Sequence, residues 1–252
     1  MGARARVENS SNMSVAQEEV EAYHIGMLLF PDMTQLDLTG PYEVFSRMPG
    51  SKVELLWKSL EPVRSEFGMT ILPTMTLQDC PQFDLLFVPG GIGQSQLMQD
   101  ETVLRFLRDQ AQLARYVTST CTGSLVLGAA GLLTGYKAAC HWLSLDLLPL
   151  LGAVPSSDRV VVDRNRITGG GVTAGIDFAL RVVEEIRGRN AAERIQLALE
   201  YDPAPPVSAG SPRTASAELV SQLRHGNRER QAMRLRTVMA AANALARPGG
   251  ER

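Results

Sequence analysis

Short apolar runs alternate with amphipathic helical segments from His24 onward, and this alternation constrains the fold more than any other feature. The runs are HIGMLLF (24–30), VELLWKS (53–59), DLLFVPGG (84–91) and RYVTST (115–120). They are apolar on both faces, as strands covered by two layers of helices must be. Segments with helical spacing lie between them, over 38–48 and 101–114. The order predicts an α/β fold with a parallel sheet covered on both faces.

The second half of the chain continues this pattern and then changes in composition. We expect helices over about 122–130, 141–151, 175–188 and 190–201, and a strand pair within RVVVDRNRITGG (159–170). Four prolines in DPAPPVSAGSPRTAS (202–216) cannot continue a helix and indicate an extended connection. The predicted organisation is a disordered extension over 1–22, a compact domain over 23–202, and a Pro-rich connection with a C-terminal amphipathic helix over 203–252.

The C-terminal segment has helical spacing from about Ala217, interrupted at Gly226. Its expected buried stripe consists of Leu235, Val238, Met239, Ala242 and Leu245. Residues 217–247 contain six arginines and two glutamates. We interpret these charges as a solvated face or a dimer-packing arm; the alternative is a basic helix that binds phosphate.

Composition excludes several classes of protein. The 25 Lys and Arg against 27 Asp and Glu give no global attraction to nucleic acid or anionic lipid. Three cysteines are too few for a disulfide framework and have no metal-ligand spacing. The charge-free stretch 116–136 is too rich in Gly, Ser and Thr for a membrane helix. The N-terminus lacks the apolar run of a secretory signal, so we expect a cytoplasmic protein.

Cys121 stands where a predicted strand runs directly into a helix start, in RYVTST-Cys121-TGSLVLGAAGLL. Such an elbow holds its side chain at the carboxyl end of a parallel strand, where open α/β sheets bind ligands. The first amides of the next helix stabilise a negative sulfur. Cys121 is therefore a candidate nucleophile, with an inert core cysteine as the alternative. Cys80 and Cys140 stand at no elbow and are expected to be structural.

A thiolate needs a partner that handles protons, and Asp37 is the strongest candidate. It lies among apolar residues in PDMTQLDLTGP (31–41), just after the first predicted strand. Asp37 is either a helix-capping residue or an acid at the carboxyl end of the sheet. The residue directly after Cys121 is Thr122, so a hydrolase-type Cys-His dyad is not evident, although His141 could approach in the fold.

Two Gly-rich segments, PGGIG (89–93) and TGGGVTAG (168–175), follow predicted strands. Their backbone amides could hold an oxyanion or a thiolate. Tight turns and phosphate binding are the alternatives, although neither segment has a dinucleotide or P-loop pattern.

Five motifs, taken together, resemble the ThiJ/PfpI superfamily. In chain order they are LLFPDMTQLDLTGPYEVF, FDLLFVPGG, YVTSTCTGSLVLGAAGLLTGYKAACHW, ITGGGVTAGIDFAL and QLALEYDPAPPVSAGSP, within roughly residues 23–216. The resemblance implies a flavodoxin-like parallel-sheet sandwich of the class I glutamine amidotransferase-like type, and a homodimer. It implies a nucleophile at Cys121, a partner acid at Asp37 and an active-site position for Thr122.

The resemblance also bears on the surroundings of the cysteine and on the reaction. It implies that Gly91 lies beside the pocket, and that backbone groups around Gly170 and Val172 support the cysteine. The motifs are most similar to those of the isocyanide-hydrating members, which implies conversion of R–N≡C to R–NH–CHO. In that reaction Cys121 attacks the protonated carbon, Asp37 transfers protons and water expels the sulfur. The implied partner is a small-molecule isocyanide; no metal, organic cofactor, nucleic acid or membrane is expected.

Other branches of the superfamily fit the sequence less well. Protease-like and many glyoxalase-like members have a histidine directly after the cysteine and a glutamate early in the chain, where this sequence has Thr122 and Asp37. AraC-type regulators carry a similar domain followed by two helix-turn-helix units, for which the 36 residues after Ser216 are too few. A non-enzymatic ligand sensor stays the alternative to an enzyme.

Overall fold

Seven strands form the central sheet in the order β10-β11-β7-β6-β1-β2-β5. All neighbouring pairs are parallel except β10 and β11, which form an antiparallel hairpin. This computed structural model describes residues 21–246, so the expected disorder over 1–22 falls almost wholly outside the described residues. The sheet strands are β1 (Tyr23–Leu28), β2 (Ser51–Trp57), β5 (Met75–Thr76), β6 (Leu85–Val88), β7 (Tyr116–Thr120), β10 (Val160–Asp163) and β11 (Arg166–Gly169).

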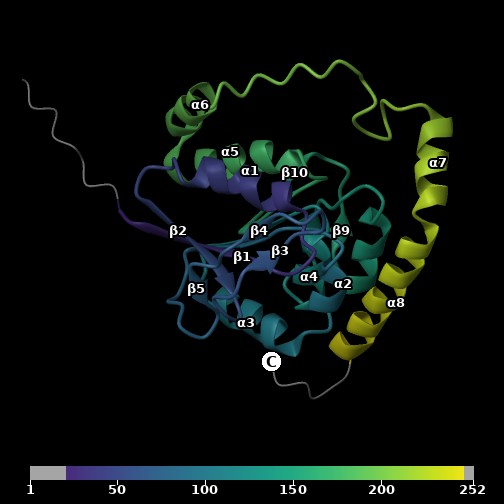
Figure 1. Ribbon diagram of the computed structural model, residues 1–252, viewed down its shortest axis with the longest axis horizontal. Coiled ribbons are helices and arrows are strands. Elements are labelled where there is room, and N and C mark those ends of the chain that lie inside the picture. Colours follow the sequence, from purple (N-terminus) through teal and green to yellow (C-terminus); the bar gives the residue numbers. More distant parts are fainter. Residues whose placement is uncertain (1–20, 247–252) are drawn as a thin grey trace, which may run out of the picture.

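Helices cover both faces of the sheet, with α1 and α5 on one side and α3 and α4 on the other (Figure 1). The parallel, doubly covered α/β fold predicted from the sequence is confirmed. The helices are α1 (Gln35–Phe45), α2 (Gln94–Leu97), α3 (Glu101–Ala111), α4 (Gly123–Ala129), the 3₁₀ helix η1 (Leu145–Leu151), α5 (Ala174–Arg187), α6 (Arg189–Ala198), α7 (Ala217–Gly226) and α8 (Arg228–Leu245). Two small pairs complete the structure: β3 (Val63–Arg64) with β4 (Thr70–Ile71), and β8 (Lys137–Ala138) with β9 (Val154–Pro155).

Three phenylalanines join the sheet to its α1 and α5 layer. Phe87 of β6 lies with its ring centre 6.3 Å from that of Phe45 in α1 and 5.5 Å from that of Phe178 in α5. All three side chains are fully buried. Each such burial contributes about 1.5–3 kcal/mol to folding, so this cluster fixes both helices against β6, which pairs with the strand β7 that leads to Cys121.

The helix expected over 141–151 is shorter than predicted and is not an α-helix. It begins at Leu145 and continues as the 3₁₀ helix η1 to Leu151. Pro149 lies inside it and has no N–H to donate to a carbonyl four residues earlier, which disfavours a regular α-helix.

The face that the C-terminal helix buries also differs from the prediction. The buried side chains of α8 are Arg234, Thr237, Val238 and Ala241. Of the predicted stripe, Leu235, Met239 and Leu245 are 39%, 52% and 41% exposed. The stripe was right for Val238, which is fully buried, and for Ala242, which is half-buried against the core. It was wrong for the other three residues, because α8 packs against η1, α4 and α2, where polar groups accept hydrogen bonds from a buried arginine.

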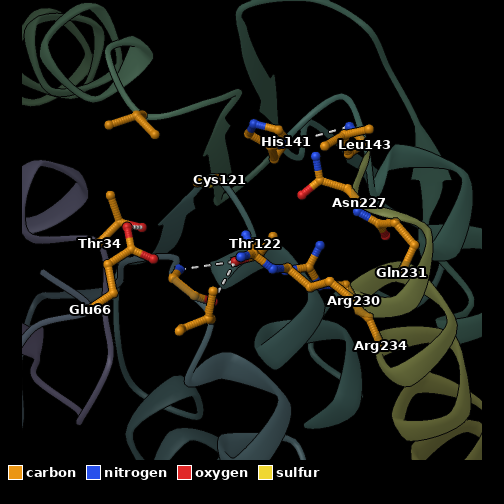
Figure 2. Close-up of a pocket in the computed structure, with 13 residues that line it drawn as sticks. Thr34, Glu66, Cys121, Thr122, His141, Leu143, Asn227, Arg230, Gln231 and Arg234 are labelled. Atoms are coloured by element: carbon orange, nitrogen blue, oxygen red, sulfur yellow. Dashed lines mark hydrogen bonds between the residues drawn. The ribbon is translucent and has the colours of Figure 1, made fainter. Parts of the chain in front are cut away.

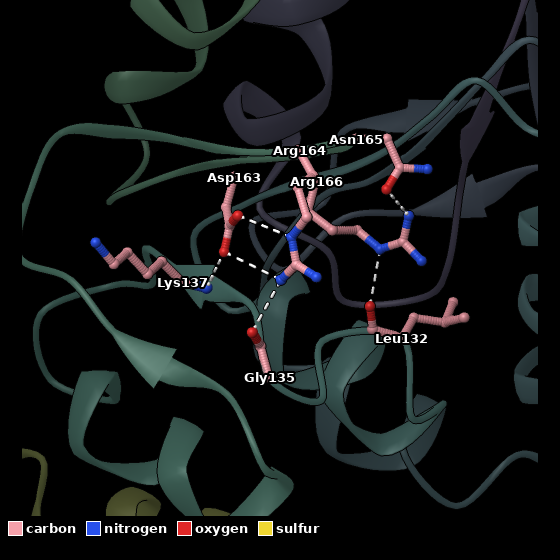
Figure 3. Close-up of polar contacts among 7 residues, drawn as sticks. All are labelled: Leu132, Gly135, Lys137, Asp163, Arg164, Asn165 and Arg166. Carbon is pink, nitrogen blue, oxygen red and sulfur yellow. Dashed lines mark hydrogen bonds and ion pairs between the residues drawn. The ribbon is translucent and has the colours of Figure 1, made fainter.

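Polar contacts tie the β10–β11 hairpin to the segment that follows α4 (Figure 3). The Arg164 Nη2 donates to the Gly135 carbonyl at 2.9 Å, and the Arg166 Nε donates to the Leu132 carbonyl at 2.8 Å. The Asp163 carboxylate accepts from the Lys137 amide at 2.7 Å. These bonds fix the antiparallel edge of the sheet, and with it the end of β11 beside Cys121.

The charge-free stretch 116–136 forms β7, α4 and the turns after them; residues 117–130 are buried, whereas Thr134 and Gly135 are exposed. Within residues 21–246, no helix combines the length and the apolar character needed to cross a membrane.

Candidate active site

Cys121 occupies a sharp backbone elbow between β7 and α4. Its φ is 53°, a left-handed conformation that costs a residue other than glycine about 1–3 kcal/mol. Two carbonyls at the end of β11 hold it there: the Cys121 amide donates to Gly169 at 3.1 Å and to Gly170 at 2.7 Å. The neighbouring strand thus fixes the elbow, and the cysteine lies at the carboxyl edge of the sheet, as its sequence context predicted.

Asp37 approaches the cysteine from α1, the helix that follows β1. Its side chain is fully buried, and neither oxygen has a hydrogen-bond partner of normal geometry among the described residues. A Cβ at Gly90 would lie 2.8 Å from the Asp37 Oδ2 and 2.7 Å from the Cys121 Cβ. The bare backbone of Gly90 therefore lets the acid and the thiol approach each other. The capping interpretation of Asp37 was wrong, since Thr34 precedes the helix and Asp37 caps nothing.

The acid and the thiol share an environment that disfavours charge. Burial raises the pKa of Asp37 to about 7, against smaller lowering effects of the Cys121 side chain and the Gly90 backbone. Burial and the charge of Asp37 also raise the pKa of the Cys121 thiol well above its ordinary value, although the Thr122 amide lowers it. The Thr122 amide at the start of α4 thus lowers the pKa of the thiol by less than burial and Asp37 raise it. The sequence had led us to expect that this amide would stabilise a negative sulfur. Near neutral pH the pair carries one negative charge at most.

The Thr122 hydroxyl locks the elbow to the turn after β6. It accepts from the Gly91 amide at 3.1 Å and lies 3.2 Å from the Gly91 carbonyl, to which it donates. Gly91 has a φ of 141°, and a Cβ there would lie 2.4 Å from the Thr34 amide nitrogen. The Gly170 amide is likewise used internally, donating to the Arg159 carbonyl at 2.9 Å. The two Gly-rich segments therefore serve as tight turns around the elbow, and these two amides are not free to hold an oxyanion.

Cys121 lines a cavity of about 170 Å³ (Figure 2). This volume resembles that of a cavity that holds benzene, about 150 Å³. Asp37 does not line it and lies behind the cysteine. The lining residues are Thr34, Glu66, Gly91, Ile92, Cys121, Thr122, His141, Leu143, Val172, Asn227, Arg230, Gln231 and Arg234.

The structure brings together the residues that the sequence singled out. Of these, Cys121, Thr122, Gly91 and Val172 line the cavity. The other two stand just behind: Gly170 holds the cysteine backbone through its carbonyl, and Asp37 lies against the elbow.

His141 also reaches the cavity, as a neutral imidazole. Burial, followed by the charge of Arg234, lowers the pKa of His141 to about 4. Its Nδ1 accepts from the Leu143 amide at 3.3 Å, which leaves the proton on Nε2. Trp142, considered as a residue that sets substrate shape, is not among the lining residues.

Sequence reasoning missed the wall formed by the C-terminal helices. Asn227, Arg230, Gln231 and Arg234 come from α8 and its start, and Figure 2 shows the two arginines extending toward Thr122. The available signal was the spacing of Arg230 and Arg234, which places both on one helix face. The opposite wall carries Glu66, whose Oε1 accepts from the Thr34 hydroxyl at 2.8 Å. Across the residues that the structure describes, no cluster of His, Cys, Asp and Glu side chains is suited to a metal ion.

Comparison with known proteins identifies the family of this domain. The model of the DJ-1/PfpI family matches residues 24–185. The chain belongs to the DJ-1/PfpI family. Within that family, it is 55% identical to the isonitrile hydratase of Pseudomonas putida over 216 residues, which are 86% of this chain and 94% of that one.

Two further proteins are similar to this chain. The crystal structure of a THiJ/PfpI family protein from Pseudomonas syringae superposes with a TM-score of 0.85 at 43% identity, covering 94% of this chain and 97% of that one. The HTH-type transcriptional regulator GbdR of Pseudomonas aeruginosa is 31% identical over 187 residues, or 71% of this chain. The match spans only 50% of the regulator's length.

Proposed function

We propose that this protein is an isonitrile hydratase that converts isocyanides to N-substituted formamides. The observation that carries the proposal is the 55% identity to the Pseudomonas putida isonitrile hydratase over nearly the whole of that enzyme. The site agrees with this chemistry, because a strained cysteine faces a small cavity and has a buried carboxyl group behind it.

Cys121 and Asp37 act as one unit that holds a single proton and a single negative charge. In the reactive arrangement the proton is on Asp37 and the charge is on sulfur. The terminal carbon of R–N≡C takes the proton from Asp37 and becomes electrophilic. The thiolate then forms a C–S bond to that carbon, which yields the thioimidate R–N=CH–S–Cys and leaves Asp37 as a carboxylate.

Water completes the reaction by adding across the C=N bond. Its oxygen bonds to the carbon and one of its protons goes to nitrogen, with Asp37 relaying the proton. The hydroxyl of this adduct then loses its proton as the C–S bond breaks, and that proton returns to the sulfur. The products are R–NH–CHO and the pair in its starting state. Thr122 and Gly170 support the reaction by holding the elbow, through Gly91 and the Cys121 amide respectively.

The walls of the cavity favour a compact substrate. A volume near 170 Å³ accommodates a small aryl or alkyl isocyanide, with Ile92, Leu143 and Val172 as apolar surface. We further propose that the enzyme acts as a homodimer in the cytoplasm, on the basis of the family resemblance and the free cysteines at 80, 121 and 140.

A ligand-sensing role is the second candidate, because the same domain matches part of a transcriptional regulator. A sensor would bind an isocyanide or a related small molecule without turnover, and the purified full chain would retard DNA at physiological salt. Incubating the protein with p-nitrophenyl isocyanide and following the formamide product separates the two. Catalytic formation of formamide supports the hydratase, whereas binding without product, together with DNA retardation, supports the sensor.

A further inference from the structure

Arg234 is a buried cation in the wall of the cavity. It lies on α8 with 6% of its surface exposed, and it forms no ion pair with any carboxylate within residues 21–246. An unpaired buried guanidinium costs several kcal/mol, so its presence requires an explanation.

Neutral groups hold the guanidinium in place. The Arg234 Nη1 donates to the Ser144 hydroxyl at 2.7 Å. With their amide groups turned to satisfy their surroundings, Gln94 accepts from Nε at 2.9 Å and Gln231 accepts from Nη1 at 3.0 Å. Three bonds fix its position: one from α2, one from the residue before η1 and one from α8 itself. Because every acceptor is neutral, the positive charge stays uncompensated, and Nη2 has no hydrogen-bond partner among the residues described.

The titratable groups coupled to this charge are Cys140, Cys121 and His141. Burial lowers the pKa of Arg234 and the charge of Arg230 lowers it further, whereas negative charge on Cys140 or Cys121 raises it. Conversely, Arg234 opposes the effect of burial on the pKa of Cys140. The other charged or titratable groups at the site are Asp37, Glu66 and the neutral His141.

We propose that Arg234 is the counter-cation of the Cys121 thiolate, stabilising the negative charge on sulfur when the thiol proton passes to the Asp37 carboxylate. In that step the S–H bond breaks, an O–H bond forms on Asp37, and the net charge of the pair is unchanged. The charge moves from the fully buried acid to Cys121, which lines the cavity together with Arg234. Arg234 thus acts through Cys121, by stabilising the negative charge on its sulfur.

This role is an addition to the family fold. The family model ends at residue 185, whereas Arg234 comes from the C-terminal helix α8. The inference rests on the proposed nucleophilic role of Cys121. It gives α8 a function that the packing of its half-exposed apolar residues alone does not explain.

The test measures thiol reactivity without an isocyanide. Intact protein is treated with iodoacetamide between pH 6 and pH 10, and the alkylation rate of Cys121 is read from its peptide by mass spectrometry. We expect Arg234→Met to react about tenfold more slowly than wild type near neutral pH, since a neighbouring opposite charge shifts a pKa by 1–3 units. Arg234→Lys, which keeps the charge, should recover much of the rate.

Two further variants separate charge from structure. Gln94→Glu keeps Arg234 in place and neutralises it through the same Nε contact, without touching the cavity wall, and should also slow alkylation. Arg236→Met removes an exposed cation from the same helix and should react as wild type does.

Wild-type rates in folded Arg234→Met, or in Gln94→Glu if Arg234→Met does not fold, would overturn the proposal. A slow Arg234→Lys combined with a wild-type rate in Gln94→Glu would do so too, since it would show a structural role alone. Absence of isocyanide turnover in wild type would instead count against the hydratase function and leave the alkylation result to be judged separately.

Discussion

Asp37 and Cys121 face each other across the backbone of Gly90, and no side chain stands between them. A Cβ on Gly90 would lie 2.8 Å from the acid's Oδ2, 2.7 Å from the cysteine's Cβ and 2.6 Å from the Thr122 amide nitrogen. These distances leave no room for a methyl group. The acid–thiol pair therefore depends on a glycine two residues after β6, as well as on its own two residues.

Gly90→Ala tests this dependence. The added methyl group would push Asp37 away from Cys121, and a misplacement of about 1 Å can lower a rate about 100-fold. We expect kcat for isocyanide hydration to fall by that order, with some loss of stability. Gly226→Ala is the matched control, because a Cβ there meets nothing within 4 Å. An active Gly90→Ala enzyme would show that close approach is not required.

The raised pKa of Asp37 predicts how stability depends on pH. The folded state holds a proton up to about pH 7, whereas the unfolded carboxyl group loses it near 3.8. Between these values the unfolded state binds fewer protons, so the free energy of unfolding falls as pH rises, by roughly 4 kcal/mol in all. In urea denaturation, Asp37→Asn should gain stability relative to wild type between pH 4 and pH 8. The control is Asp32→Asn, at an exposed residue with positive φ, whose stability should depend on pH as that of wild type does. If the difference in stability between Asp37→Asn and wild type did not change with pH, the prediction would be contradicted.

The ionisation of Asp37 also predicts how activity falls at low pH. Below about pH 7 both Asp37 and Cys121 are protonated, and the pair cannot supply a thiolate and an acid together. We expect kcat/KM with a neutral aryl isocyanide to rise with pH through an apparent pKa near 7, since kcat/KM reports ionisations of the free enzyme. A profile that is flat from pH 5 to pH 8 would remove Asp37 from the reaction.

Thr122 is expected to act through its hydroxyl. Thr122→Val removes both contacts to Gly91 at nearly constant shape and leaves the buried Gly91 amide unpaired, at about 1–3 kcal/mol. We expect lower stability and at least tenfold lower kcat/KM. Thr122→Ser keeps the hydroxyl and should retain most of both. Equal losses in the two variants would point to the methyl group instead.

The alternation of apolar runs and helices predicted the sheet and its covering, because burial on both faces leaves a clear pattern in the sequence. The strand-to-helix junction likewise marked Cys121. The sequence left the role of Asp37 open, because spacing alone does not show whether Thr34 or Asp37 precedes the first helical residue.

The face of α8 was predicted only in part, because amphipathic spacing places every arginine in solvent. Arg234 is buried through acceptors that are distant in sequence, Ser144 and Gln94, and such partners are known only once the chain has folded. Local patterns do not reveal contacts of this kind. The spacing of Arg230 and Arg234 places both on one face of α8, but it does not show that this face lines the cavity.

The central claim is that Cys121 and Asp37 hydrate an isocyanide. Its most direct test follows the loss of p-nitrophenyl isocyanide and the appearance of the formamide with wild type, Cys121→Ala and Asp37→Asn, using Cys80→Ser as a cysteine control remote from the cavity. We predict turnover by wild type and Cys80→Ser, and none by the two site variants. Full turnover by Cys121→Ala, or none by wild type, would contradict this account.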